Sequence, residues 1–280
     1  TQQMRVVVLA VMAALATGCD RQDAQAPETA TTPVATADAG ASTAPALPAV
    51  PATNPLKNAY FGDLHVHTAL SVDAFITSTR TLPDDAYRYA KGEAIDHVSG
   101  QQIRLGTPLD FMAVTDHAEM LGVARAMGDP DNPLSKEPVA AGITSLDFET
   151  SQQTFRGLVT QHAESAVTDM ARIATSAGAL QAGTQAWRML VDAAEAHYQP
   201  GTFTTFVAYE WSSMPNLANL HRNVVFRGTR VPERPFSSMD SNRPEELWAF
   251  LDDWRARGGD DAIAIPHNSN ASKGLMYPLE

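Results

Sequence analysis

The chain has 280 residues, enough for one large domain or two small ones. Its 20 Lys and Arg residues against 32 Asp and Glu residues give a net charge of −12, which argues against a nucleic-acid backbone as the main partner. A hydrophobic fraction of 44% supports a packed core, whereas the single cysteine excludes a disulfide framework and a cysteine-rich metal site.

The first residues have the pattern of an export signal. Met4-Arg5 precedes an apolar run over residues 6–16, which is too short to span a membrane comfortably and typical of a secretory signal. The run ends in Leu-Ala-Thr-Gly-Cys, which resembles a bacterial lipoprotein box. We interpret residues 1–19 as a lipoprotein signal peptide with Cys19 as the lipidated residue; the alternative is a buried core segment with an ordinary cysteine. The first interpretation predicts export to the periplasmic face of a bacterial membrane or to the cell surface, with membrane contact only through this lipid.

Residues 20–55 differ from the rest of the chain in composition. They are rich in Ala, Thr and Pro and contain no aromatic residue. Such a stretch buries too little apolar surface to offset the entropy of ordering it. We therefore expect a disordered linker over residues 20–55 and a folded domain over residues 56–280.

Within that domain, short apolar strands alternate with amphipathic helices. The expected strands are Tyr60–Val66, Leu109–Val114, Thr204–Tyr209, Asn223–Phe226 and Ala262–Ile265. The expected helices are Pro83–Lys91, Thr154–Ser176, Thr184–His197 and Pro244–Arg257. Strands interleaved with helices favour an α/β fold with a mainly parallel sheet, either open or closed into a barrel. Polar residues at the carboxyl ends of such strands mark the functional site.

The first strand carries a pattern suited to a metal ion. Residues two apart in a strand point to the same face, so Asp63, His65 and His67 project together. Two imidazoles on a rigid strand form a natural ligand pair for one divalent ion such as Zn, Mn or Fe.

Three later segments follow the same rule, in which an apolar strand meets His, Asp or Glu at its edge. Asp116 and His117 follow the second strand, and Glu210 emerges from the third, where an unpaired carboxylate is costly to bury. His221 and His267 flank the last two strands. The recurrence predicts a metal site. The remaining histidines are interpreted as ordinary residues, His97 in a loop and His162 and His197 in helices.

Five strings carry a resemblance to a known family: YFGDLHVHTALSVDA, PLDFMAVTDHAEMLG, FVAYEWSS, NLHRNVVFRG and IPHNSNASKG. Together they resemble the bacterial DUF3604 family, which is similar to the PHP metal-dependent phosphoesterases, over roughly residues 58–280. The resemblance implies a distorted (β/α)7-type barrel with two or three Mn, Zn or Fe ions at its C-terminal mouth. It further implies that His65 and His67 hold the first ion, that Glu210 bridges to a second, and that His221 and His267 complete the second ion's ligands.

The sequence departs from the PHP pattern at two places. Asp73 stands where many PHP proteins have a third His; with His117 it serves a third ion or leaves that site weak. PHP proteins also place an Asp-x-His ligand pair late in the chain, and no such pair follows His267. Because the family extends further and residue 1 is not Met, we expect residues 56–280 to be a truncated barrel.

The implied reaction is hydrolysis of phosphate or aryl sulfate esters by metal-activated water, with a small anionic ester as substrate and no nucleic acid. Arg222, Asn268 and Lys273 are candidate contacts for the ester oxygens, or else solvated loop residues. Asp63 and Asp116 either hold a ligating imidazole in one tautomer or pass a proton.

Two other classes of function stay open. A metal-dependent amidohydrolase also begins with His-x-His on a barrel strand, but we find no Lys at a strand end to bridge its metals. A non-catalytic metal-binding lipoprotein would use the same histidines and leave no open coordination position. Loss of ester hydrolysis on chelation distinguishes an enzyme from the latter.

Overall fold

The computed structural model describes residues 56–160 and 171–277. In chain order their elements are β1 (Gly62–Val66), α2 (Val72–Ile76), α3 (Pro83–Ala90), β2 (Ile95–Asp96), β3 (Gln102–Ile103), β4 (Phe111–Val114), α4 (Val123–Met127), η1 (Pro133–Lys136), α5 (Ala140–Ile143), α6 (Phe148–Thr160), α8 (Ala177–His197), β5 (Thr204–Phe206), β6 (Ala208–Trp211), η2 (Pro215–Leu217), β7 (Arg222–Phe226), α9 (Pro244–Ala256) and β8 (Ala262–Pro266). All five expected strands are present. The expected helix over 154–176 overlaps α6, and part of it lies outside the described residues. The predicted signal peptide 1–19 with Cys19 and the predicted linker 20–55 also lie outside the described residues.

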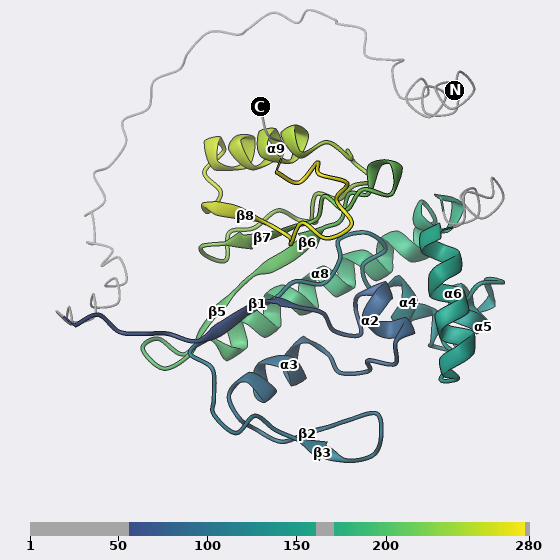
Figure 1. Cartoon of the computed structure of the whole chain (residues 1–280), viewed down its shortest axis with the longest axis horizontal. Helices are drawn as coiled ribbons and strands as arrows, with labels where there is room; N and C mark the ends of the chain where they lie inside the picture. The colour runs from purple at the N-terminus through teal and green to yellow at the C-terminus, as the bar shows by residue number, and fades with distance from the viewer. Residues whose placement is uncertain (1–55, 161–170, 278–280) are drawn as a thin grey trace, which may run out of the picture. The chain divides into compact units, whose positions relative to one another are not determined.

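The strands form small sheets in a mixed α/β arrangement (Figure 1). β1, β4 and β5 pair in parallel, and β6, β7 and β8 pair antiparallel. The expectation of a mainly parallel sheet is therefore right for the first sheet and wrong for the second. The connection over residues 212–221 is too short for a parallel crossover, which needs roughly a dozen residues, so β7 returns beside β6 in the opposite direction. The described strands do not close into a barrel, and the (β/α)7 barrel stays a prediction.

The strand over residues 204–211 belongs to both sheets. Its first half, β5, pairs with β4, while its second half, β6, pairs with β7. An isolated parallel bridge between His117 and Glu210 carries the pairing with the first sheet past the break between the two halves. This shared strand brings the ends of the two sheets together.

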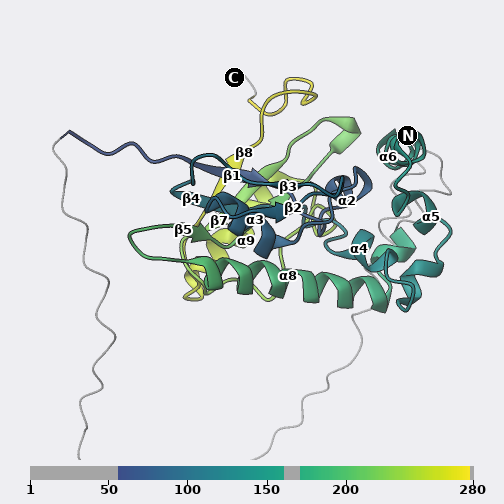
Figure 2. The same cartoon turned by 90° about the horizontal axis from the view of Figure 1, so that it is seen from below.

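Helices bury the apolar faces of these strands. Trp187 and Leu190 of α8 and Leu247 of α9 join one core with Tyr209 and Val224 of the strands. Figure 1 shows α9 over β7 and β8, and Figure 2 shows the length of α8 running along the strands that it contacts. Each large side chain fully buried in this way contributes about 1.5–3 kcal/mol to folding. No helix of residues 56–160 and 171–277 has the length and apolarity to cross a membrane.

The longest helix in the described part of the chain, α8, begins earlier than the sequence predicts. The pattern favours a start at Thr184, whereas the helix starts at Ala177. The Ser176 side chain caps it by accepting a hydrogen bond from the Ala179 backbone N–H at 3.2 Å. Gly178 and Gly183 lower the helix propensity of this first part, which explains why the pattern alone places the start too late.

β1 and β4 approach each other closely at Gly62. A Cβ atom there would lie 2.3 Å from the carbonyl oxygen of Phe111, so only glycine fits. This close pairing fixes β1 against β4 and, with it, the histidines at the ends of both strands.

Candidate metal centre

Five imidazoles surround one buried carboxylate. The Glu210 side chain on β6 has no exposed surface. The distances from its oxygens to the nearest nitrogens are 3.0 Å for His117, 3.1 Å for His67, 3.3 Å for His221, 3.8 Å for His65 and 3.9 Å for His267. Neighbouring rings within the group have centroids between 4.5 and 5.6 Å apart. We call these six residues, together with Asp73, the histidine cluster.

Strand direction explains why these residues meet. β1, β4 and β5 are parallel, and β6 continues β5, so their carboxyl ends lie at one edge. His67 and His117 lie just beyond the ends of β1 and β4. β7 runs the other way, and the residue before it, His221, therefore reaches the same edge. The backbone N–H of His267 donates to the carbonyl oxygen of His221 at 2.9 Å, which places the last histidine beside it.

Asp73 extends the cluster on the side away from Glu210. It lies in the first turn of α2, and its oxygens are 3.0 and 3.2 Å from Nδ1 of His67. The same carboxylate is 3.6 Å from Nε2 of His117. The residue before α2, Ser71, accepts a hydrogen bond from the backbone N–H of His117 at 2.7 Å. α2 is thus tied directly to the loop that follows β4.

The cluster is strongly coupled electrostatically. Burial raises the pKa of Glu210, but the imidazoles of His117, His221 and His67 close to its oxygens outweigh burial and hold that pKa well below its usual range. Burial lowers the pKa of His67 and His117, yet the nearby carboxylates of Asp73 and Glu210 raise their pKa values to about 9 and about 10. The pKa of Asp73 is held low against burial by the same two imidazoles. Without a metal ion, protons therefore compensate the two carboxylates.

The donor atoms also fit metal ions. Both Glu210 oxygens and Nε2 of His67 and of His221 are buried with no hydrogen-bond partner that satisfies the geometry, which is unusual for polar atoms of a native interior. Three overlapping groups each bring their ligand atoms within 4.8 Å of one another: His65, His67 and Glu210; His67, Asp73 and His117; His117, Glu210 and His221. Imidazole with carboxylate is the ligand set that Zn, Mn and Fe accept. The residues present fit a divalent cation, and the cluster contains groups that can hold one.

The two predicted acidic residues outside the cluster bond to backbone. Asp63 accepts a hydrogen bond from the backbone N–H of His65 at 2.9 Å. Asp116 is fully buried and accepts from the backbone N–H and hydroxyl of Thr68 at 2.6 and 2.7 Å. Burial raises the pKa of Asp116 despite these bonds. Asp116 thus fixes the turn that follows His67, and neither aspartate forms a hydrogen bond to an imidazole in the described part of the chain.

The three predicted substrate contacts lie in different surroundings. Arg222 is opposite Trp211 in the β6–β7 register, one residue from the Glu210 pair, and its guanidinium lies 5.9 Å from the Trp211 ring. Because side chains alternate along a strand, Arg222 faces away from Glu210. Asn268 accepts from Nδ1 of His267 at 3.0 Å, and the Lys273 ammonium group donates to a backbone carbonyl at 2.6 Å. The structure brings Asn268 to the cluster and turns Arg222 away from it.

The sequence analysis missed three polar residues around His117. Ser71 and Ser212 contact its backbone N–H and its Nδ1 atom, respectively. Glu119 accepts from the backbone N–H of Ser212 at 3.2 Å. The sequence could have indicated Ser212, because it lies two residues after Glu210 and side chains two apart in a strand point to the same face.

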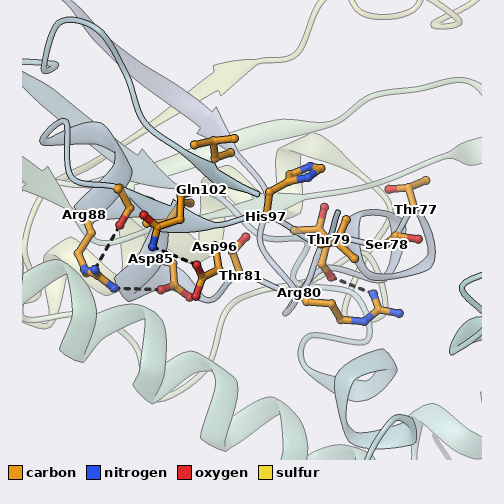
Figure 3. A pocket seen from close by; sticks show the side chains of 14 residues that line it. Thr77, Ser78, Thr79, Arg80, Thr81, Asp85, Arg88, Asp96, His97 and Gln102 are labelled. Carbon is orange, nitrogen blue, oxygen red and sulfur yellow. Dashed lines mark hydrogen bonds and ion pairs between the residues drawn. The ribbon is translucent and has the colours of Figure 1, made fainter. Parts of the chain in front are cut away.

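A separate pocket of about 640 Å³ lies between the α2–α3 loop and the β2–β3 hairpin (Figure 3). No residue of the histidine cluster lines it. Its arginines are already engaged, Arg88 with Asp85 and Glu93, and Arg80 with backbone carbonyls. His97 lines this pocket and bonds to Ser99, while His197 bonds to Asp84, so both histidines lie apart from the cluster. Among the described residues, the groups that could hold a metal ion lie in the cluster rather than here.

No curated protein and no solved structure matches the chain. One family model does match, described as "Protein of unknown function (DUF3604)", and the match extends over residues 54–280. The matched region contains every residue of the histidine cluster, and it covers most of the chain. The chain therefore belongs to the DUF3604 family.

Proposed function

We propose that the protein is a metal-dependent hydrolase of phosphate or aryl sulfate esters. The observation that carries the proposal is the Glu210 carboxylate, fully buried, without exposed surface and within 3.9 Å of five imidazoles. An ionised carboxylate costs several kcal/mol to bury unless cations compensate it. The arrangement therefore lowers the stability of the fold unless cations are bound, and it is well suited to holding them.

The cluster divides between two or three ions. His65 and His67 would hold the first, and Glu210 would bridge it to a second that His221 and His267 complete. Asp73 with His117 would hold a third. Asp73 supplies a carboxylate oxygen near both neighbouring imidazoles, which supports a third ion over a weak position.

Divalent ions in such a site lower the pKa of bound water toward 7 and neutralise the oxygens of an anionic ester. The residues of this chain hold the ligands in place for that reaction. The side-chain oxygen of Asn268 accepts a hydrogen bond from Nδ1 of His267, so that Nε2 of His267 faces Glu210. Asp116 fixes the turn that carries His67 through both of its carboxylate oxygens. No Ser or Cys nucleophile is part of the proposal.

The proposed substrate is a small anionic ester. Phosphate and sulfate esters share tetrahedral geometry and anionic oxygens, so one site accommodates either. A net charge of −12 disfavours nucleic acid. Because Arg222 faces away from Glu210, the proposed contact to the ester oxygens is Asn268, which bonds to His267. Lys273, whose ammonium group donates to the Asn216 carbonyl, stays a second proposed contact.

The same proposal includes the place of action. Cys19 would attach the protein by lipid to the periplasmic face of a membrane or to the cell surface, with residues 20–55 as a spacer. Scavenging of small esters outside the cytoplasm agrees with this location. Labelling of Cys19 by a fatty acid, detected by mass spectrometry, tests it.

The experiment for the hydrolase uses the full chain. Elemental mass spectrometry should find two or three Mn, Zn or Fe ions per wild-type molecule and fewer in the His65→Ala/His67→Ala variant. The matched control is His97→Ala, which removes an exposed loop imidazole that bonds to Ser99, away from the cluster, and should leave the metal content unchanged. The metal-loaded wild-type protein should hydrolyse 4-nitrophenyl phosphate or 4-nitrophenyl sulfate, and a chelator should abolish the activity.

Three results would contradict the proposal in different ways. A wild-type protein without bound metal, after growth with added metals, would show that the cluster is not a metal centre. A metal-loaded protein that hydrolyses neither ester would instead indicate a metal-binding protein. Cleavage of amide but not ester substrates would favour the amidohydrolase class.

A further inference from the structure

Ser212 contacts His117 in a way that determines where the imidazole carries its proton. The Ser212 hydroxyl lies within hydrogen-bond distance of Nδ1 of His117, and it is also 3.3 Å from the backbone carbonyl oxygen of Glu210. A carbonyl oxygen only accepts, so the single hydroxyl proton is committed to it. The hydroxyl oxygen must then accept from His117, which requires a proton on Nδ1.

Nδ1 has a second neighbour on the same side of the ring. A carboxylate oxygen of Glu210 lies 3.0 Å from it, so Nδ1 faces Ser212 and Glu210 together. With the proton on Nδ1, the lone pair of a neutral His117 is on Nε2. That atom faces Asp73 at 3.6 Å. His117 therefore belongs with His67 and Asp73 rather than with the alternative group of Glu210 and His221.

Glu119 holds Ser212 where this contact is possible. One of its carboxylate oxygens accepts from the backbone N–H of Ser212 at 3.2 Å and from that of Ser238 at 2.5 Å. Its other oxygen is buried without a hydrogen-bond partner. The backbone N–H of Ala118 donates to the Glu210 carbonyl at 2.8 Å, so residues 117–119 contact the end of β6 along their length. The Glu119 carboxylate therefore fixes the loop that carries Ser212.

We propose that Ser212 is a positioning residue for His117, which it keeps protonated at Nδ1 so that Nε2 is directed to the ion shared with Asp73, and that Glu119 holds Ser212 in place. The inference rests on the proposed function, because it presumes that the cluster binds metal. The role of Ser212 is orientation; its hydroxyl contacts neither Asp73 nor the remaining histidines among the described contacts.

The wild-type protein alone provides the first test. The full chain, labelled with ¹⁵N at histidine and loaded with Zn²⁺, is recorded by long-range ¹H–¹⁵N correlation, which distinguishes a protonated ring nitrogen from a metal-bound one. We expect His117 to be bound through Nε2 with a proton on Nδ1. Coordination through Nδ1 would overturn the inference whatever the variants do.

Variants then test Ser212 itself. Ser212→Ala should weaken the binding of one ion by about 10–100-fold, the usual effect of losing a partner of a ligating histidine, whereas Ser212→Thr keeps the hydroxyl and should restore it. Ser213→Ala is the matched control, since this neighbouring buried hydroxyl donates to the Asn242 carbonyl at 2.7 Å and should not affect metal affinity. Glu119→Ala should resemble Ser212→Ala, and Glu119→Gln, which keeps an accepting oxygen, should restore most of the affinity.

The outcomes separate this inference from the proposed function. A wild-type chain that binds no Zn²⁺ contradicts both. A wild-type chain that binds Zn²⁺ while Ser212→Ala binds it equally well overturns the role of Ser212 and leaves the metal centre in place. Equal losses in Ser212→Ala and Ser213→Ala would show a general effect on the loop, which also overturns the specific role.

Discussion

Glu210 and Asp73 are two carboxylates whose charges the protein balances with imidazoles. Both are held ionised by the nearby imidazoles of His67 and His117, and the two carboxylates in turn raise the pKa of each imidazole. Protons and metal ions thus compete for the same lone pairs. The pKa of His65 shifts in the other direction, because burial outweighs the nearby carboxylate and lowers it. His65 is therefore more readily available to a metal ion than His67 and His117.

Metal affinity should rise with pH as a result. With pKa values of about 9 and about 10, His67 and His117 each carry a proton at neutral pH in the metal-free chain, and binding must release it. The sign follows: affinity is lowest at acid pH and increases by up to about tenfold per pH unit for each proton displaced, until the pH passes these pKa values. Titration with Mn²⁺ between pH 7 and 9 checks this, together with calorimetry in buffers of different ionisation enthalpy. An affinity that does not change over this range would contradict it.

Much of the site was predictable because its residues follow strands. His65 and His67 are two apart on β1, and Glu210 emerges from an apolar strand, so alternation and burial indicate both. The orientation of Arg222 was not predictable, because it depends on which face of the antiparallel β6–β7 pair meets the cluster. The roles of Ser71 and Glu119 depend on contacts between segments far apart in the chain, which no local pattern contains.

At the scale of elements, the segment between β4 and α4 joins the histidine cluster to the helices. Its last residue, Gly122, precedes α4 with a φ of +73° and donates its N–H to the Leu70 carbonyl at 2.8 Å. A Cβ atom there would lie 2.7 Å from Cβ of Ala186 and 3.0 Å from the carbonyl oxygen of Ala182 on α8. The segment can therefore pack against α8 only with glycine at this point.

Gly122→Ala should lower the free energy of unfolding by about 2–4 kcal/mol, the sum of a left-handed backbone and a steric overlap in a packed interface. Gly100→Ala is the matched control: its φ is +80°, but no atom lies within 4 Å of the added Cβ. The control should lose only about 1 kcal/mol. Urea denaturation of both variants measures the difference, and equal losses would show that the contact with α8 is not tight.

The element types were predictable from local pattern, but their pairing was not. Pro at the start of α3 and of α9, and apolar runs in β4 and β6, are visible in the sequence. Alternating strands and helices favour parallel pairing, yet β7 pairs antiparallel with both of its neighbours. The short connection over residues 212–221 was a signal against a crossover, and the general pattern outweighed it in the prediction.

At the scale of the whole molecule, the cluster joins segments that are otherwise distant in the chain. Its residues come from β1, α2, the end of β4 and β6, from the position before β7 and from the position after β8. An ion bound there cross-links both sheets in the folded state and has no equivalent site in the unfolded chain. Binding free energy then adds to the stability of the fold.

Chelation should therefore destabilise the protein. At a free metal concentration about a thousandfold above the dissociation constant, one ion contributes about 4 kcal/mol, which corresponds to a midpoint of thermal unfolding roughly 10 °C higher. Thermal unfolding with Mn²⁺ and with a chelator measures the shift. The His65→Ala/His67→Ala variant should lose most of it, and an unchanged midpoint in the wild-type protein would indicate that bound metal does not cross-link the sheets.

The strand shared by both sheets also constrains the order of folding. Glu210 lies on its second half, so the cluster cannot form until residues 204–211 have paired with β4 on one side and β7 on the other. Its ligands are separated by most of the folded chain, from His65 to His267, and contacts at such separation form late because long loops must close first. Metal uptake would then be a late event in folding, and a molecule that holds its ions is one whose two sheets have already assembled.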